Sequence, residues 1–80
     1  MPTLVIYSRH DCHLCDVAMA EVERLQRRID FAVEVRDVDA DPAWREAYGE
    51  EVPVGMIGAR KVFKHRVDPE RLGKALLSGR

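Results

Sequence analysis

Four segments of the chain carry short runs of apolar and β-branched residues that are typical of strands. Residues 3–7 form an apolar run without polar alternation, which favours an interior strand that is buried on both faces. Residues 31–38 alternate between apolar and polar positions. Residues 53–57 and 60–64 are two shorter runs joined by a Gly-Ala pair, which suits a type II′ hairpin turn. The pattern therefore predicts four strands.

Three other segments have the period of a helix. From residue 12 or 13 to about residue 28, apolar side chains recur at spacings of three and four, and Asp11 is the expected N-cap. Asp-Pro pairs at residues 41–42 and 68–69 each supply an N-cap and a first helical position for a shorter helix. Gly79 lies at the expected end of the last helix.

The predicted order is β-α-β-α-β-β-α. Its opening strand–helix–strand unit implies a parallel pair with a right-handed crossover, and the late hairpin adds antiparallel strands. We expect an α/β fold with a four-stranded mixed sheet flanked by helices. Because no repeat, linker or low-complexity segment divides the chain, residues 1–80 are expected to form one domain.

Composition and charge narrow the function classes. Apolar residues make up 46% of the chain and charged residues 34%, which is too hydrophobic for intrinsic disorder. The 13 basic residues are interleaved with 14 acidic ones, which argues against binding to nucleic acid or an anionic membrane. The N-terminal apolar run is too short for a signal peptide and lacks a basic flank. We expect a cytoplasmic monomer.

The two cysteines, Cys12 and Cys15, form a C-x-x-C pair. A disulfide between them would close a loop of four residues and stabilise the fold by only about 2 kcal/mol. A small secreted scaffold needs several bridges across longer loops. The pair therefore indicates redox chemistry or metal binding.

Cys12 lies where the first predicted strand passes into the first predicted helix. The unpaired N–H groups and the positive end of the helix dipole at this point favour a thiolate, which is the nucleophile. Arg9 and His13 add positive charge, with His13 the candidate for lowering the pKa of the Cys12 thiol, whereas Asp11 acts in the opposite direction. Cys15 lies one turn along the helix, within disulfide reach. This pattern predicts an exposed attacking thiol with a resolving thiol beneath it.

Two other interpretations of the motif stay open. The cysteines can be two small buried apolar residues, as free cysteines often are. Alternatively, the motif and its two histidines offer four candidate zinc ligands, although four ligands within six residues would close a tetrahedron with difficulty. These ligands are His10, Cys12, His13 and Cys15.

Pro53 begins the third predicted strand. Only about 5–6% of X–Pro peptide bonds in folded proteins are cis, so base rates favour a trans Val52–Pro53 bond. The residues alone do not decide between the two isomers.

Three stretches together resemble a known family. They are Y-S-R-H-D-C-H-L-C-D at residues 7–16, D-V-D-A-D-P at residues 37–42 and V-P-V at residues 52–54. The chain is similar to glutaredoxin-like proteins of the thioredoxin superfamily, in particular the short bacterial ones that carry C-H-L-C. The resemblance covers nearly the whole chain. It implies a thioredoxin-like fold and thiol–disulfide oxidoreductase activity.

The resemblance also implies residue roles and partners. Cys12 would be the nucleophile and Cys15 the resolving thiol. The substrates would be disulfide-containing or glutathionylated proteins, with glutathione as a candidate electron donor and no bound cofactor. A module that binds or assembles a metal or an iron–sulfur cluster on the same fold is the alternative.

Four further positions match the substrate-binding residues of the family. Pro53 would be in the cis form and would face the disulfide. The backbone of Val52 would pair with an extended substrate, such as the cysteinyl part of glutathione. Arg9 would bind a glutathione carboxylate, and Asp68 would hold the γ-glutamyl end.

The chain departs from the family pattern at three places. Leu14 replaces the aromatic residue of the usual C-P-Y-C motif, and Glu51 replaces the threonine before Val-Pro. Arg66-Val67 replaces the glycine pair that precedes the aspartate of the last helix. Thiol–disulfide chemistry is compatible with these changes, whereas glutathione as the specific partner does not follow from the residues.

Overall fold

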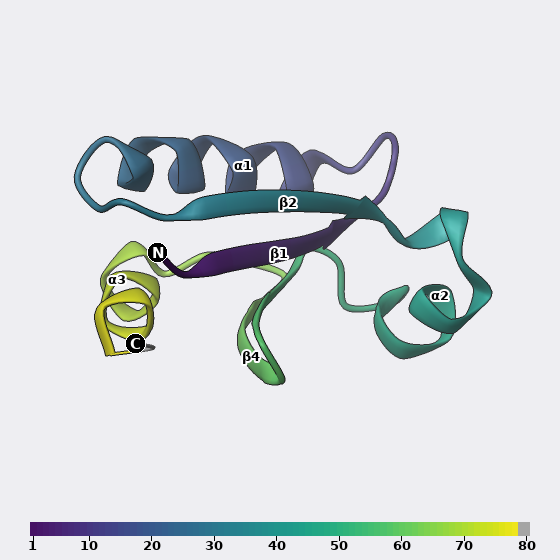
Figure 1. Ribbon diagram of the computed structural model, residues 1–80. Helices are drawn as coiled ribbons and strands as arrows, with labels where there is room; N and C mark the ends of the chain where they lie inside the picture. The colour runs from purple at the N-terminus through teal and green to yellow at the C-terminus, as the bar shows by residue number, and fades with distance from the viewer. Residues whose placement is uncertain (79–80) are drawn as a thin grey trace.

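The computed structural model describes residues 1–78, and its elements follow the predicted order (Figure 1). Gly79 lies outside the described residues. The strands are β1 (Thr3–Ser8), β2 (Ala32–Asp37), β3 (Val54–Ile57) and β4 (Arg60–Lys64). The helices are α1 (His13–Gln26), the short 3-10 helix η1 (Val38–Ala40), α2 (Pro42–Tyr48) and α3 (Pro69–Ser78).

The four strands form one mixed sheet in the order β2-β1-β3-β4. Strand β1 runs parallel to β2 and antiparallel to β3, and β3 and β4 form an antiparallel hairpin. Gly58, in the turn of this hairpin, has a φ of 60°, the positive value that a type II′ turn requires at its first central position. The predicted sheet and the interior place of β1 are confirmed.

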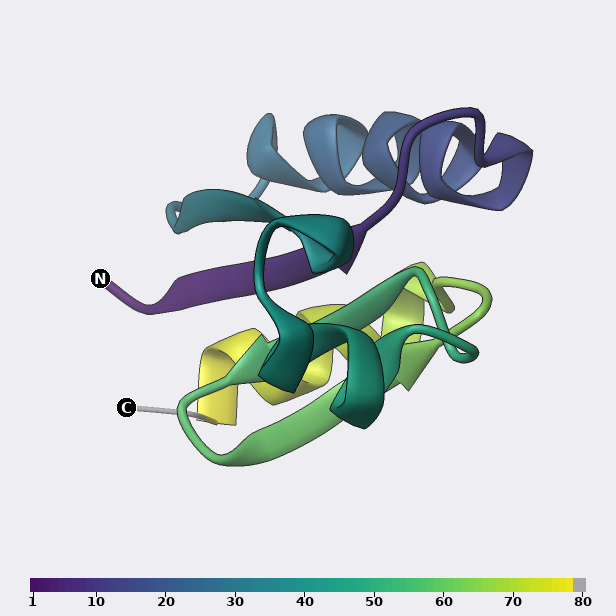
Figure 2. The same ribbon diagram turned by 90° about the vertical axis from the view of Figure 1, so that its right-hand side faces the viewer.

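The sheet separates two groups of apolar side chains. Helices α1 and α3 cover one face, whereas η1 and α2 cover the other, so that α2 and α3 lie on opposite sides of the sheet in Figure 2. Strand β1 serves both faces, because Leu4 and Ile6 belong to the first group and Tyr7 belongs to the second. This double burial explains the unbroken apolar run. Trp44 and Tyr48 of α2 pack against the second group, as their spacing suggests.

Two details of α1 differ from the prediction. Its N-cap is Cys12 and not Asp11, because the Cys12 sulfur accepts the Cys15 backbone N–H. Asp11 has a φ of 56° and forms the turn that leads from β1 into the helix. Val17 is 48% exposed, although it follows Leu14 by three positions and so continues the apolar spacing that predicts the buried face of this helix. Within residues 1–78, none of the helices has the length and apolar character needed to cross a membrane.

Candidate active site

Cys12 and Cys15 form a disulfide at the first turn of α1. Their Cα atoms are 5.2 Å apart, within the usual range for a disulfide. The Cys15 N–H lies 3.2 Å from the Cys12 sulfur and donates a hydrogen bond to it. The N-terminal end of the helix thus directs both a backbone donor and its dipole at this sulfur, which favours the thiolate of Cys12 after reduction.

The two cysteine residues differ in exposure. Cys12 is half-buried, whereas Cys15 is only 4% exposed and lies among the buried residues of α1. Only an accessible thiolate attacks a disulfide quickly. The arrangement therefore suits Cys12 to attack an external disulfide and Cys15 to react within the molecule.

The Val52–Pro53 bond is cis, as the family resemblance implies and against the base rate. Pro53 is fully buried, and Val52 is half-buried. The carbonyl oxygen of Pro53 accepts the His65 N–H at 2.8 Å, and the Glu51 carbonyl lies 3.2 Å from the same nitrogen. Strands β3 and β4 are thus joined at the point where the Val52–Pro53 segment enters the sheet.

A groove of about 420 Å³ adjoins the C-x-x-C motif. Its lining comes from the first two turns of α1, including His13 and Leu14 of the motif, and from the segment that connects β4 with α3. The lining residues are His13, Leu14, Val17, Ala18, Glu21, His65, Arg66, Val67 and Pro69. His65 and Arg66 were not predicted as site residues. The sequence marked Arg66 only as part of the Arg66-Val67 pair that departs from the family pattern before Asp68, and it carried no local signal for His65. The role of His13 in favouring the thiolate stays a prediction.

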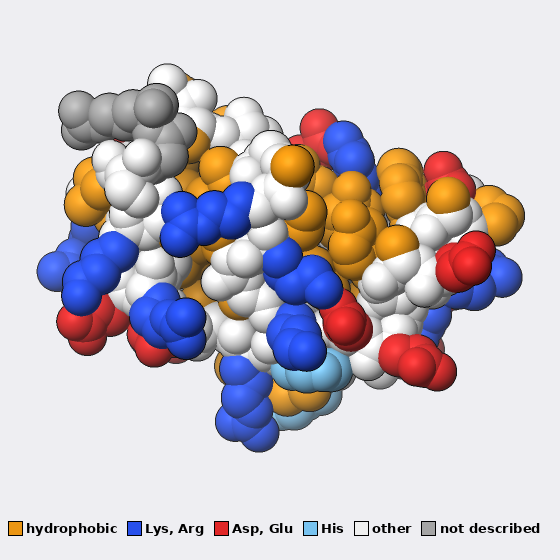
Figure 3. Space-filling model, turned by 90° about the horizontal axis from the view of Figure 1, so that it is seen from below, with side chains coloured by type: hydrophobic (Ala, Val, Ile, Leu, Met, Phe, Trp, Pro, Cys, Tyr) orange, Lys and Arg blue, Asp and Glu red, His pale blue; other side chains and the backbone are white. Residues whose placement is uncertain are grey.

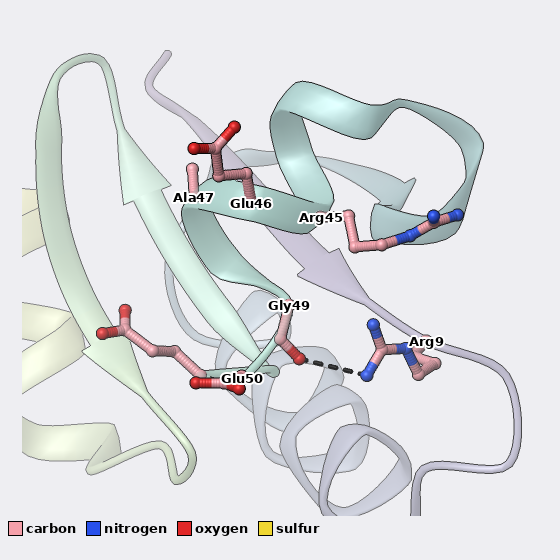
Figure 4. Close-up of a pocket in the computed structure, with 7 residues that line it drawn as sticks. Arg9, Arg45, Glu46, Ala47, Gly49 and Glu50 are labelled. Carbon is pink, nitrogen blue, oxygen red and sulfur yellow. Dashed lines mark hydrogen bonds between the residues drawn. The ribbon is translucent and has the colours of Figure 1, made fainter.

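Arg9 is held by groups of the protein itself. Its guanidinium donates to the Asp39 carboxylate at 3.0 and 3.2 Å. It also donates to the Gly49 carbonyl at 3.1 Å (Figure 4). Arg45 also donates to Asp39, at 3.2 Å. The hydrogen bond from Arg9, together with Arg45, holds the pKa of Asp39 below its usual value. Arg9 thus ties the segment after β1 to η1 and to the end of α2.

Arg9 also lines a hollow of about 620 Å³, next to the glutamates at residues 50–51. Glu51 lies directly before Val52, and its negative charge is paired within the protein. Lys61 of β4 donates a hydrogen bond to its carboxylate and thereby lowers the pKa of Glu51.

Asp68 caps α3, because its Oδ1 accepts the N–H groups of Glu70 and Arg71. It lies in a third hollow, which it shares with basic residues of β4 and α3. Arg9, Asp68 and the two middle residues of the motif, His13 and Leu14, thus line three different hollows, and neither cysteine is among the lining residues of the third. The roles of Arg9, Val52, Pro53 and Asp68 in substrate binding stay predictions.

Metal binding was an open interpretation of the motif. Among the residues that the structure describes, histidine, cysteine, aspartate and glutamate side chains form no group of three that could hold a metal ion. In the disulfide state both sulfurs are bonded to each other.

Comparison with known proteins identifies relatives over most of the chain. A model of the glutaredoxin-like domain (DUF836) matches residues 3–77. The chain is similar to "Glutaredoxin-like protein YDR286C homolog" of Dictyostelium discoideum, with 31% identity over 72 residues. This match spans 82% of the chain and 67% of the Dictyostelium protein.

Three solved structures show the same architecture. Protein XcR50 from X. campestris has 34% identity and a TM-score of 0.76, covering 94% of this chain and 96% of that one. Protein Ne2328 from Nitrosomonas europaea has 28% identity and a TM-score of 0.81, covering 91% and 88%. A thioredoxin mutant from Halobacterium salinarum has 28% identity and a TM-score of 0.67, covering 96% and 73%. The thioredoxin-like fold is thus confirmed, and a C-x-x-C pair in this fold supports a redox role.

Proposed function

The chain belongs to the family of glutaredoxin-like domains (DUF836), and from this membership we propose that it is a dithiol thiol–disulfide oxidoreductase. Its substrates are proteins that carry a disulfide or a mixed disulfide with glutathione. The observation that carries the proposal is the Cys12–Cys15 disulfide at the start of α1, with Cys12 the more exposed of the two residues.

The reaction consists of two exchange steps. The Cys12 thiolate attacks one sulfur of the substrate disulfide, which breaks the S–S bond, releases one thiolate and leaves the other half bound to Cys12. Cys15, deprotonated, then attacks the Cys12 sulfur, which expels the second half as a thiolate and forms the Cys12–Cys15 disulfide. The released thiolates take up two protons. The substrate has gained two electrons and the protein has lost two.

A thiol donor must then reduce the Cys12–Cys15 disulfide. We take glutathione as the candidate: two molecules would supply the two electrons and leave as glutathione disulfide. The groove beside His13 and Leu14 supports access of a small thiol, because it opens next to the motif. Arg9 offers limited support, because its guanidinium already binds Asp39 and Gly49.

The test separates the roles of the two thiols. Cys12→Ser should abolish the reduction of bis(2-hydroxyethyl) disulfide, because Cys15 is too buried to attack it. Cys15→Ser should keep the first step and accumulate a mixed disulfide on Cys12. The measurement is mass spectrometry of each variant after incubation with glutathione disulfide, with the wild type and the double variant as controls.

Equal rates of adduct formation on Cys15 in Cys12→Ser and on Cys12 in Cys15→Ser would contradict this mechanism. A freshly purified brown, iron-containing dimer without reductase activity would favour the alternative of a cluster-binding module. Turnover supported by thioredoxin reductase, and not by glutathione with its reductase, would keep the chemistry and replace the proposed donor.

A further inference from the structure

Positive charge is concentrated on one face of the molecule, formed by β4 and the first half of α3. Residues 60–74 hold six of the thirteen Lys and Arg residues but only two of the fourteen Asp and Glu residues. Figure 3 shows Lys and Arg side chains gathered across this face, with histidine at its border. We call residues 60–74 the basic face. Its six basic residues, all exposed, are Arg60, Lys61, Lys64, Arg66, Arg71 and Lys74.

Most of this charge is not compensated within the protein. Lys61 pairs with Glu51, and Lys74 lies 3.6 Å from Glu70. The remaining acidic residue of the segment, Asp68, accepts N–H groups at the start of α3. Within residues 1–78, no carboxylate forms an ion pair with the other four basic residues, which are Arg60, Lys64, Arg66 and Arg71.

The basic face also contains a hollow. A hollow of about 300 Å³ lies between β4 and α3. Val62 and Phe63 form its apolar part. Its charged lining consists of four basic residues, Lys61, Lys64, Arg66 and Arg71, and one carboxylate, Asp68, which already accepts N–H groups at the start of α3. A segment with carboxylate side chains fits such a hollow, because each carboxylate can accept charge-assisted hydrogen bonds from two cations while its methylene groups contact the apolar part.

The basic face adjoins the redox centre. Arg66 lines both the basic hollow and the groove that contains His13 and Leu14 of the motif. His65, between Lys64 and Arg66, donates its backbone N–H to Pro53. A polypeptide whose disulfide reaches Cys12 therefore has neighbouring residues within reach of this face.

We propose that the basic face docks an acidic segment of the protein substrate, close in sequence to the cysteine whose disulfide is reduced. This inference rests on the proposed function and adds the chemistry of the substrate. Outside residues 60–74 the chain has seven basic and twelve acidic residues. That excess of negative charge repels a long polyanion, so a short acidic segment suits the charge distribution better than nucleic acid or a membrane does.

The test uses three peptides that differ only in the residues flanking one cysteine. The flanks carry glutamate, glutamine or lysine, and the cysteine is blocked by an uncharged mercaptoethanol mixed disulfide. The rate at which the protein reduces each peptide is divided by the rate at which dithiothreitol reduces the same peptide. This ratio corrects for the intrinsic reactivity of each mixed disulfide. At low ionic strength kcat/KM should be about tenfold higher for the glutamate peptide than for the glutamine peptide, and 0.5 M salt should remove most of this preference.

Single charge reversals locate the effect. Lys64→Glu and Arg71→Glu should each lower the preference for the glutamate peptide several-fold and leave the reduction of bis(2-hydroxyethyl) disulfide unchanged, because both residues line the basic hollow and neither lines the groove beside the motif. Arg27→Glu is the matched control, because it makes the same change of charge at the far end of α1, about 20 Å along the helix from the disulfide. It should leave the preference unchanged. Circular dichroism checks that each variant is folded.

The possible failures are distinguishable. If bis(2-hydroxyethyl) disulfide is not reduced, the proposed function is wrong, and fluorescence anisotropy with cysteine-free peptides then tests docking alone. If the small disulfide is reduced but the glutamate and glutamine peptides react equally, the docking inference is wrong. The same holds if Arg71→Glu and Arg27→Glu behave alike, or if random-sequence duplex DNA binds more tightly than the glutamate peptide.

Discussion

Reduction of the Cys12–Cys15 disulfide should lower the free energy of unfolding only slightly. The oxidised and the reduced protein must both be folded if the pair cycles during catalysis. Neither cysteine belongs to either of the two apolar clusters on which the sheet packs. The perturbation is therefore confined to the first turn of α1.

The expected size follows from the loop that the disulfide closes. The cysteines are three positions apart, so the bridge constrains a loop of four residues in the unfolded chain, which contributes about 2 kcal/mol. In the reduced protein, the helix dipole and the N–H of Cys15 stabilise a Cys12 thiolate, typically by about 0.3–1 kcal/mol. The oxidised form should therefore be more stable than the reduced form by about 1–2 kcal/mol.

This difference is linked to the reduction potential. For a two-electron couple, about 30 mV corresponds to 1.4 kcal/mol. Because the fold favours the oxidised form, it should lower the reduction potential of the pair by about 20–45 mV relative to the unfolded chain. We expect a potential between that of thioredoxin and those of typical glutaredoxins, roughly −270 to −200 mV. Equilibration with glutathione buffers measures it.

The stability assay is urea unfolding at pH 7, followed by far-ultraviolet circular dichroism, with and without a phosphine reductant. The double variant Cys12→Ser/Cys15→Ser is the control, because its transition should be the same in both buffers. A loss of more than about 4 kcal/mol on reduction, or a potential below about −300 mV, would refute the reasoning. The pair would then be a structural bridge.

Two further predictions concern packing and charge. Gly55→Ala should lower the free energy of unfolding by about 1–3 kcal/mol and Tm by several degrees, because the added Cβ would overlap the ring of Phe63. Calorimetry measures Tm, and an unchanged Tm would show that the ring moves aside. Arg9 and Arg45 lower the pKa of Asp39 in the folded protein. The Asp39 carboxylate should therefore stabilise the fold fully at pH values above about 4, its pKa in the unfolded chain. This stabilisation should be lost as the pH falls through the lower pKa of the folded state. Asp39→Asn should therefore be less stable than the wild type at pH 6, with urea midpoints that converge towards pH 3, and a constant difference would contradict this assignment.

Features that depend on neighbouring residues follow from the amino-acid sequence. The aspartates at the start of α2 and α3 cap these helices as predicted, because a cap joins residues two or three positions apart. The unbroken apolar run of β1 indicated an interior strand, and the C-x-x-C spacing placed both sulfurs on the first turn of α1. Asp11 is the exception, because it forms the turn after β1 and Cys12 is the N-cap of α1.

Which charged residues distant in the sequence come into contact depends on the tertiary structure. Arg9 pairs with Asp39, 30 positions away, and with the Gly49 carbonyl, 40 positions away; Glu51 meets Lys61 across the sheet. A net charge of −1 conceals the excess of basic residues at positions 60–74, and only the packing of the hairpin against the last helix gathers these residues around one hollow. Side-chain spacing reports contacts within one element, whereas contacts between elements depend on the register of the sheet and the packing of helices against it.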